Sequence, residues 1–350
     1  MLRQIDPLID CRWDKFIINH PEGLIFHHSA WMRVLIDKYG EKHKYFILEN
    51  KNGEITGIAP FFNLKGILYG NQFICLPNTD TCFPLANDQK GYNELLNEIM
   101  QEIIQNKSVY AQIKGCSKFA LPQGCNIYPG KNYLLVQTVD LKRDFRTIRA
   151  GMTRNGRYNL RLAEKQSFSI KFGQDEKDLR LFYKMLVNTL QKNNAFPPEY
   201  TFLRSIFRNL INNNFGCILF AEDNGKIVAG NMYLCFKKSA LCKYSAQINK
   251  YSESRPNYFL HWKAIEHFYN QSFSSYDFGA TDPNDQGLLF FKRNWGIKET
   301  KRSFYYYPEE TVSKLLSLGK PFKKTYGNMI RVIPEGMLAA LSSAINKYLY

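Results

Sequence analysis

The chain has 350 residues, which is long for one hydrophobic core and sufficient for two domains. Hydrophobic residues make up 45% of it and aromatic residues 15%, a composition that excludes an intrinsically disordered chain. The formal net charge of +16 favours anionic partners, namely phosphates, nucleic acid or an acidic membrane surface, without choosing among them.

The eight cysteines contain no C-x-x-C pair, and several lie inside apolar runs, as is typical of reduced core residues rather than of a disulfide framework or a zinc site. The six histidines show no metal-ligand spacing, so we expect no metal. Asp6 and Asp10 interrupt the apolar residues at the N-terminus, and no run is long enough to span a bilayer. We therefore expect a cytoplasmic protein, soluble or at most peripheral to a membrane.

In the first half, amphipathic spacing predicts helices over 12–20 and 29–39. Two apolar strands then flank Asn52-Gly53, which is a strong local signal for a β-hairpin. A helix over 92–107 and two further strands, the last over 133–141, complete the segment. We expect a first domain over residues 1–141.

The same order recurs in the second half, where two predicted helices precede strands that flank Asn224-Gly225. A strand, a helix that begins at Pro256, the strand 274–279, a short helix over 287–295 and a last strand follow. The recurrence favours a tandem duplication with a second domain over 142–307. Coincidence of a common turn dipeptide is the alternative.

Residues 308–350 differ from both halves, because two apolar-faced helices flank the basic segment KPFKK. We expect this helical tail to pack onto the body of the protein. The alternative is that a basic amphipathic tail rests on an anionic membrane.

Residues 142–171 hold nine basic and two acidic residues. Thr153 is placed to cap a helix on which Arg154, Arg157 and Arg161 share one face. A solvated helix face normally mixes charge signs, whereas this one barely does, and the planar guanidinium suits bidentate phosphate binding. A phosphate site is favoured over a solvated face, and the residues leave open whether RNA, a nucleotide-linked sugar or a lipid carrier bears the phosphate.

The stretch from Tyr276 to Gly296 sets Lys292 among Phe290, Phe291 and Trp295. If the aromatic side chains are buried, the ammonium is held beside an apolar wall, where a fixed cation stabilises a developing oxyanion. The alternative is that the lysine stem covers the aromatics and its ammonium stays in water.

The motifs G-x-x-x-x-G-K-[ST], G-x-G-x-x-G and G-x-S-x-G are absent from the sequence. The sequence therefore gives no motif basis for an NTPase, a dinucleotide enzyme or a serine hydrolase. Two α/β units, a basic helix at their junction and a cation near aromatic residues suit acyl transfer between two bound substrates.

The chain resembles the FemAB-like branch of the GNAT superfamily, which includes peptidoglycan cross-bridge aminoacyltransferases and acetyltransferases of exopolysaccharide clusters. Seven segments carry the resemblance in their order and spacing: FHHSAW (26–31), GEITGIAP (53–60), RNGRYNLRLAEK (154–165), NGKIVAG (224–230), PNYFLHW (256–262), YDFG (276–279) and FKRNWG (291–296).

The resemblance implies an α/β fold of tandem GNAT-like domains, each a mixed sheet flanked by helices, with the helical tail of residues 308–350 packing back on the first domain. It also implies a reaction that passes an acyl or aminoacyl group to an amine. It implies that Lys292 stabilises the reacting carbonyl or the donor and that the arginine-rich helix meets a phosphate-bearing substrate. Tyr244, Asn257 and Trp262 would line the site, with Phe291 beside the lysine. Asp277 is the candidate proton acceptor, although a strand-end aspartate more often caps a turn.

The loop NKYSESRPN departs from the usual GNAT pattern, because it contains no glycine where a glycine-rich loop binds the pyrophosphate of CoA. Arg255 and the free N–H groups of the following helix still offer an anion site. We expect no tightly bound cofactor, and the acyl donor remains either acyl-CoA or aminoacyl-tRNA.

The sequence thus predicts an acyltransferase that acts on an amine of a peptidoglycan or polysaccharide precursor bearing a phosphate, with tRNA as one of two donors. One alternative is a CoA-dependent N-acetyltransferase of a sugar or small amine. The other is a protein without catalytic activity that binds RNA or anionic lipid at a membrane surface.

Overall fold

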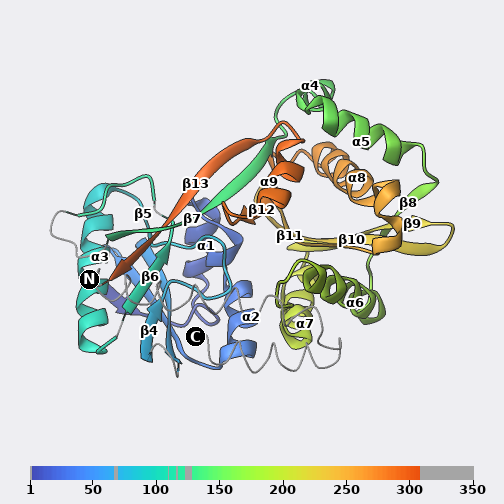
Figure 1. Cartoon of the computed structure of the whole chain (residues 1–350). Helices are drawn as coiled ribbons and strands as arrows, with labels where there is room; N and C mark the ends of the chain where they lie inside the picture. Colours follow the sequence, from blue (N-terminus) through green and yellow to red (C-terminus); the bar gives the residue numbers. More distant parts are fainter. Residues whose placement is uncertain (1, 67–69, 109, 116, 123–127, 308–350) are drawn as a thin grey trace. The chain divides into compact units, whose positions relative to one another are not determined.

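The structure is a computed structural model that describes residues 2–66, 70–108, 110–115, 117–122 and 128–307 (Figure 1). The helical tail predicted over 308–350 lies outside these residues. The described chain forms two compact units, one of residues up to 133 together with 302–307, the other of residues 134–301. The division passes through two strands, β7 (Tyr128–Asp140) and β13 (Lys298–Tyr307).

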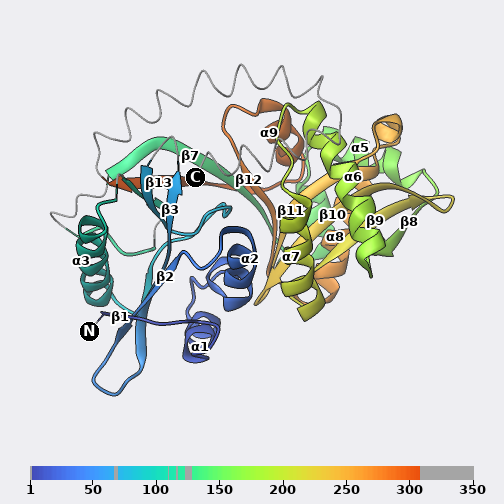
Figure 2. The ribbon, with the colours of Figure 1, turned by 90° about the horizontal axis from the view of Figure 1, so that it is seen from below.

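The first unit is a mixed sheet with helices on both faces. Its helices are α1 (Arg12–Asn19), η1 (Ile25–His27), α2 (Ser29–Tyr39) and α3 (Gln89–Gln105). Its strands are β1 (Leu2–Gln4), β2 (His43–Glu49), β3 (Ile55–Gly66), β4 (Gly70–Ile74), β5 (Leu85–Ala86), β6 (Tyr110–Lys114) and the end of β13. The order is β1-β2-β3-β4-β6-β13, with only β4 and β6 parallel among these pairs and β5 beside β3. Figure 2 shows α3 on one face and α1 and α2 on the other.

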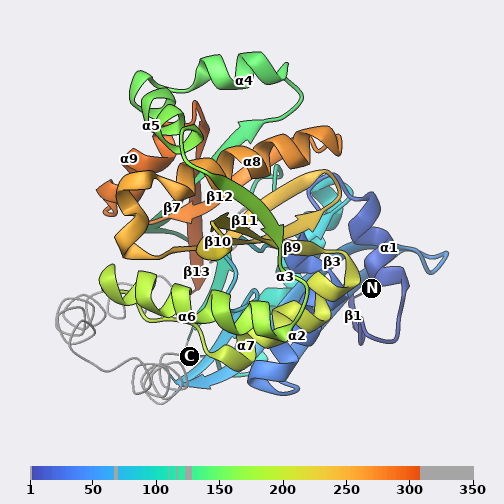
Figure 3. The ribbon, with the colours of Figure 1, turned by 90° about the vertical axis from the view of Figure 1, so that its right-hand side faces the viewer.

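The second unit repeats the plan. Its helices are α4 (Phe145–Gly151), α5 (Arg154–Glu164), α6 (Glu176–Lys192), α7 (Tyr200–Asn209), η2 (Ile211–Asn213), η3 (Asn249–Ser254), α8 (Pro256–Asn270) and α9 (Gln286–Arg293). Its further strands are β8 (Phe168–Phe172), β9 (Gly216–Asp223), β10 (Lys226–Phe236), β11 (Ser239–Gln247) and β12 (Ser275–Thr281). The order is β7-β12-β11-β10-β9-β8, and Figure 3 shows α5 and α8 on one face, α6 and α7 on the other.

Both predicted hairpins are confirmed, but their turns differ. In the second unit Asn224 and Gly225 both have positive φ, +48° and +78°, and Asp223 pairs directly with Lys226. This is the two-residue turn that an Asn-Gly dipeptide favours. In the first unit the loop is longer, since the strand resumes only at Ile55. Within this loop the amide of Gly53 donates to the carbonyl of Asn50 at 3.1 Å.

The helices predicted from apolar spacing are confirmed as α1, α2, α3, α6, α7, α8 and α9. The basic segment 142–171 contains more structure than the single helix expected, since α4 precedes α5 and β8 follows it. Pro256 opens α8, as predicted, and Arg255 is at the N-cap.

The pairing of β11 with β12 positions the candidate site. These two strands are parallel and pair only over Ser239–Leu241 and Ser275–Asp277. Beyond Asp277, β12 continues beside β7 through an irregularity in register that contains Gly279. The end of β12 therefore carries a bend directly opposite α9.

Candidate functional site

Lys292 lies in the last turn of α9 and is only 4% exposed. Its Nζ donates to the carbonyl oxygen of Gly279 and to Oγ1 of Thr281, each at 2.7 Å. The ammonium is therefore buried and hydrogen-bonded, which excludes the alternative in which it extends into water. Phe290, expected beside it, is instead 64% exposed.

The bend in β12 exists because Gly279 has a φ of +78°, a conformation that side chains with a Cβ disfavour. Oδ1 of Asp277 accepts a 2.8 Å hydrogen bond from the amide of Gly279 and so holds the bend. The bend turns the carbonyl of Gly279 toward Lys292. Asp277 thus performs the turn-capping role that was the alternative to proton acceptor, and its catalytic role stays a prediction.

A hydrogen-bonded path connects Lys292 to the surface of the unit. Thr281, which accepts from the ammonium, donates through Oγ1 to Oε1 of Gln137 at 3.0 Å. The amide nitrogen of Gln137 donates to Glu299 at 3.2 Å, and Glu299 forms an ion pair with Arg293 at 2.8 Å. Thr281 and Gln137 are buried, so their polar groups have to be paired, and this path pairs them.

His261 was not among the predicted site residues; it is a residue of α8 that the structure places near the charge of Lys292. A buried chain of hydroxyl groups leads to it: the amide of Asn231 donates to Tyr233 at 2.9 Å, Tyr233 lies 3.0 Å from Tyr276, and Tyr276 lies 2.5 Å from Nδ1 of His261. The amide nitrogen of Asn231 donates to the first hydroxyl, and the tautomer of His261 sets the direction of the hydrogen bond between Tyr276 and Nδ1.

The imidazole of His261 is neutral over the physiological range. Burial and, second, the positive charge of Lys292 lower its pKa to about 3. Its ring centroid lies 5.0 Å from that of Phe278, 5.5 Å from Phe291 and 5.8 Å from Trp295. The buried charge of Lys292 thus lies near a group of aromatic side chains, and a charge interacts more strongly in such a buried place than in water.

The segment FKRNWG (291–296), which contains Lys292, also connects α9 to α5. The hydroxyl of Thr153 caps α5 by accepting from the amide of Gly156, as predicted, and donates to Oδ1 of Asn294 at 2.6 Å. A Cβ on Gly156 would lie 2.2 Å from the carbonyl oxygen of Asn294. Asn294 in turn donates to Tyr258 at 3.0 Å. Close backbone contact therefore fixes the position of the arginine helix relative to Lys292.

The three predicted arginines of α5 have different surroundings. Arg154 and Arg161 are exposed. Arg157 is half-buried and its guanidinium donates to the carbonyl oxygens of Ala150, at 2.9 Å, and Met152. Arg157 therefore holds the end of α4, while the other two face solvent.

The remaining predicted residues lie at the start and in the first half of α8 and on β11. Arg255 has a φ of +58° and donates to Asn159 at 2.8 Å, so it ties the start of α8 to α5. Asn257 follows, and its buried Oδ1 has no hydrogen-bond partner among the described residues. Tyr244 is half-buried on β11.

Trp262 belongs to the same hydrophobic core as the aromatic neighbours of His261, but its own ring contacts lie on α4. Its ring packs 4.7 Å from that of Phe145 and lies 5.4 Å from the guanidinium carbon of Arg149, both residues of α4. The structure therefore brings Lys292, Phe291 and the turn of Asp277 together, and directs Trp262 toward α4.

Within the described ranges, no group of three or more His, Cys, Asp or Glu side chains is arranged to hold a metal ion. The same part of the chain contains no helix with the length and apolar character needed to cross a membrane.

The architecture defines the class of protein, two mixed α/β units of GNAT type in tandem. Residues 150–293 match the sequence family described as Acetyltransferase (GNAT) domain, a match that includes α5, α8, β12 and Lys292. No curated protein sequence matches the chain. The second unit thus contains the segment that matches a GNAT domain, and the predicted fold class is confirmed.

The comparison with solved structures describes the fold of the chain more closely than the family match does. FemX is similar with a TM-score of 0.72 at 13% identity, covering 88% of this chain and 97% of that one. The C-terminal domain of a putative lysylphosphatidylglycerol synthetase from Agrobacterium fabrum follows with a TM-score of 0.56 at 13% identity, covering 87% and 94%. A tandem GNAT protein from the clavulanic acid biosynthesis pathway has a TM-score of 0.53 at 8% identity, covering 87% and 97%. The chain has the FemX-like, tandem GNAT fold.

Proposed function

We propose that the chain is an acyltransferase that passes an acyl or aminoacyl group to an amine of a cell-envelope precursor. The observation that carries the proposal is the buried cation of Lys292 within the segment that matches the GNAT family. The likeness to FemX and to a lysylphosphatidylglycerol synthetase domain supports the envelope precursor as acceptor.

In the proposed reaction the amine nitrogen attacks the carbonyl carbon of the donor. The new C–N bond forms, the C–S or C–O bond to the carrier breaks, and the amine proton ends on the departing sulfur or oxygen. Negative charge develops on the carbonyl oxygen in the transition state. A fixed cation in an apolar setting lowers the energy of that state more than that of the substrate.

The residues around Lys292 would position this charge. Gly279 and Thr281 hold the ammonium at two points, and the capped turn of Asp277 holds Gly279. His261 is neutral and adds no second charge beside the lysine. Such fixed geometry contributes because no reorganisation is needed when the charge develops.

The donor is an acyl-CoA or an aminoacyl-tRNA in this proposal. The family match favours acyl-CoA, through the acetyltransferase description, and the likeness to FemX supports an aminoacyl group. With acyl-CoA the acceptor extends to a sugar or small amine. The phosphate of the acceptor would meet the exposed arginines Arg154 and Arg161.

The test is a transfer assay with full-length chain, radiolabelled acetyl-CoA or aminoacyl-tRNA, and amine-bearing peptidoglycan or polysaccharide precursors. A thermal shift with each donor first selects the one that binds the folded state. We expect Lys292→Met to lower turnover by a factor of about 10²–10³. Unchanged turnover with a working donor would remove Lys292 from the mechanism, and no transfer with either donor would contradict the function.

A further inference from the structure

Three polar side chains, Thr281, Gln137 and Glu299, form a row across three neighbouring strands of the second unit. β7 carries Gln137 and lies between β12, which carries Thr281, and β13, which carries Glu299 (Figure 1). Nζ of Lys292 donates to Oγ1 of Thr281 at 2.7 Å. Thr281 donates to Oε1 of Gln137 at 3.0 Å, and the amide nitrogen of Gln137 donates to Glu299 at 3.2 Å. This polar row connects a buried ammonium in α9 to a carboxylate on β13.

The two ends of the polar row fix the direction of its hydrogen bonds. An ammonium only donates, so Oγ1 of Thr281 accepts from Lys292 and gives its own proton to Oε1 of Gln137. A carboxylate only accepts, so the nitrogen of the Gln137 amide has to face Glu299. All the donors therefore point from the lysine toward the glutamate. Hydrogen bonds aligned in this way polarise and strengthen one another.

The far end of the polar row is a full negative charge. Arg293, which follows Lys292 in α9, donates to Glu299 from Nε at 3.1 Å and from Nη2 at 2.8 Å. These hydrogen bonds, and the one from Gln137, hold the pKa of Glu299 below its ordinary value of 4.5. Glu299 is therefore ionised over the physiological range.

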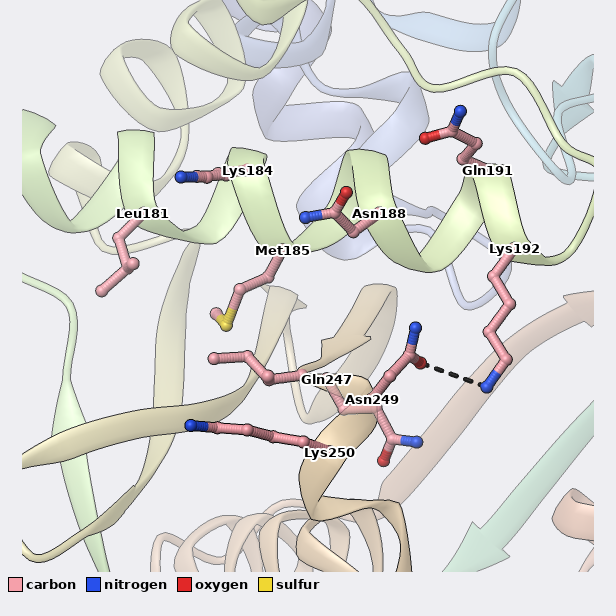
Figure 4. A pocket seen from close by; sticks show the side chains of 10 residues that line it. Leu181, Lys184, Met185, Asn188, Gln191, Lys192, Gln247, Asn249 and Lys250 are labelled. Atoms are coloured by element: carbon pink, nitrogen blue, oxygen red, sulfur yellow. Dashed lines mark hydrogen bonds between the residues drawn. The ribbon is translucent and has the colours of Figure 1, made fainter. Parts of the chain in front are cut away.

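The burial of Lys292 gives this connection its importance. Another lysine of the second unit, Lys192, donates to a neutral oxygen, Oδ1 of Asn249 at 3.1 Å, beside a surface hollow (Figure 4). Lys192 is exposed, so water hydrates its charge. Lys292 is only 4% exposed, and the oxygens of Gly279 and Thr281 that accept from it carry no formal charge. A buried charge is costly unless its surroundings replace water, and a polarised row that ends on a carboxylate does so.

We infer that Gln137 and Glu299 are positioning residues for Lys292, which fix its ammonium in place and maintain its positive charge through Thr281. Gln137 holds the hydroxyl of Thr281 in the orientation that accepts from the ammonium. Glu299 supplies the negative charge at the end of the polar row. The effect of these residues on turnover rests on the proposed function, whereas their effect on the state of Lys292 does not.

The first measurement follows the chemical reactivity of Lys292 in the full-length chain and needs no substrate. The N-hydroxysuccinimide ester of acetic acid acetylates a neutral, accessible amine, so a buried and protonated lysine reacts slowly. Peptide mass spectrometry gives the rate at each lysine. Lys114 reports any general loosening, because it is 7% exposed in the first unit and donates to the carbonyl oxygen of Leu76 at 3.2 Å. The exposed Lys192 reports the activity of the reagent.

Two variants interrupt the polar row in different ways. Gln137→Leu removes both hydrogen bonds of the amide. Glu299→Gln keeps an oxygen that accepts from Gln137 but removes the charge. The matched control is Glu266→Gln, which removes a carboxylate that pairs with Lys263 at 2.7 Å on the surface of the same unit. The double variant Gln137→Leu/Glu299→Gln tests whether the two residues act through one connected row.

We expect acetylation of Lys292 to be about fivefold faster or more in each interrupting variant, and within about twofold of wild type in Glu266→Gln. Acetylation of Lys114 should not change in any of them. The double variant should react like Gln137→Leu alone, because the charge of Glu299 no longer reaches Lys292 once the row is broken. An unchanged rate at Lys292, an equal rise at Lys114, or independent effects in the double variant would overturn the inference.

The second measurement is the transfer assay with a working donor. We expect kcat to fall about tenfold in Gln137→Leu and Glu299→Gln, because the ammonium acts on the charge of the transition state. KM should stay within about twofold, since substrate binding does not depend on that charge. An unchanged kcat in both variants would overturn the positioning role. If the wild type shows no transfer, the proposed function fails, and the acetylation rates still decide whether the polar row controls Lys292.

Discussion

Lys292 and Gly279 are joined by a 2.7 Å hydrogen bond from the lysine ammonium to the glycine carbonyl oxygen. The two residues lie in different elements, α9 and β12, and both are buried. A buried ammonium is stable only when its hydrogen bonds are satisfied. The position of the lysine therefore depends on the positive φ of Gly279 and on the second acceptor, Thr281.

Thr281→Val tests this dependence. The substitution keeps the side-chain shape but removes the hydroxyl that accepts from Lys292 and donates to Gln137. We expect the free energy of unfolding to fall by about 1–3 kcal/mol, because two buried polar groups each lose a partner. Turnover in the transfer assay should fall about tenfold, since the cation becomes less fixed. Thr281→Ser, which keeps the hydroxyl, should recover both values, and failure to do so would contradict the role given to Oγ1.

The contact between α5 and α9 predicts an opposite response at two glycines. A Cβ on Gly156 would lie 2.2 Å from the backbone oxygen of Asn294, so Gly156→Ala should separate the helices and cost more than about 3 kcal/mol of stability. The control is Gly287→Ala in α9, where the nearest atom would lie at 3.8 Å. That change should be neutral or stabilising by up to about 1 kcal/mol. Thermal unfolding measures both, and equal melting temperatures would disprove the close contact.

His261 gives the second unit a specific dependence on pH. Burial, then the charge of Lys292, lower the pKa of His261 in the folded state to about 3, below its ordinary value of 6.5. The unfolded chain therefore takes up the proton first as the pH falls. The stability from a neutral His261 is complete above pH 6.5 and decreases below it, by about 1.5 kcal/mol between pH 6.5 and 5.

The measurement compares thermal unfolding of wild type and His261→Gln at pH 7.5 and 5. Glutamine offers Tyr276 an acceptor but does not titrate, so the variant should lose less stability than the wild type over this interval. The same loss in both proteins would show that other groups account for the acid sensitivity.

Much of the fold follows from local patterns. Apolar spacing located α1 and α3, and Asn-Gly dipeptides located both hairpins. The aromatic neighbours of Lys292 marked it as unusual. The hydrogen-bond acceptors of Lys292 on β12 depend on a bend that has no strong local signal. The strand β8 was not predicted, because it is short and lies within a basic segment.

His261 was not predicted as a site residue, because its contacts are not local in the sequence. Its partners Tyr276 and Phe278 lie on β12 and contact it only when α8 packs on the sheet. A usable signal was present in the sequence: His261 is a polar residue between Leu260 and Trp262 on a helix whose neighbouring residues are apolar. Periodicity assigns such a residue to the buried face but does not identify its partner.

The three arginines of α5 should separate into two kinds. Arg157→Gln removes the hydrogen bonds to the carbonyls of Ala150 and Met152, and we expect a loss of about 1–3 kcal/mol in stability. Arg154→Gln and Arg161→Gln change exposed side chains and should leave the melting temperature within error.

If the two exposed arginines contact substrate phosphate, each change raises KM for the phosphate-bearing acceptor about tenfold and reduces the dependence of KM on salt. Thermal unfolding and acceptor titrations at two salt concentrations measure these effects. Lys165→Gln, just beyond the same helix, is the control. An equal rise in KM in this variant would show that general surface charge, rather than contact of Arg154 and Arg161 with phosphate, accounts for the effect.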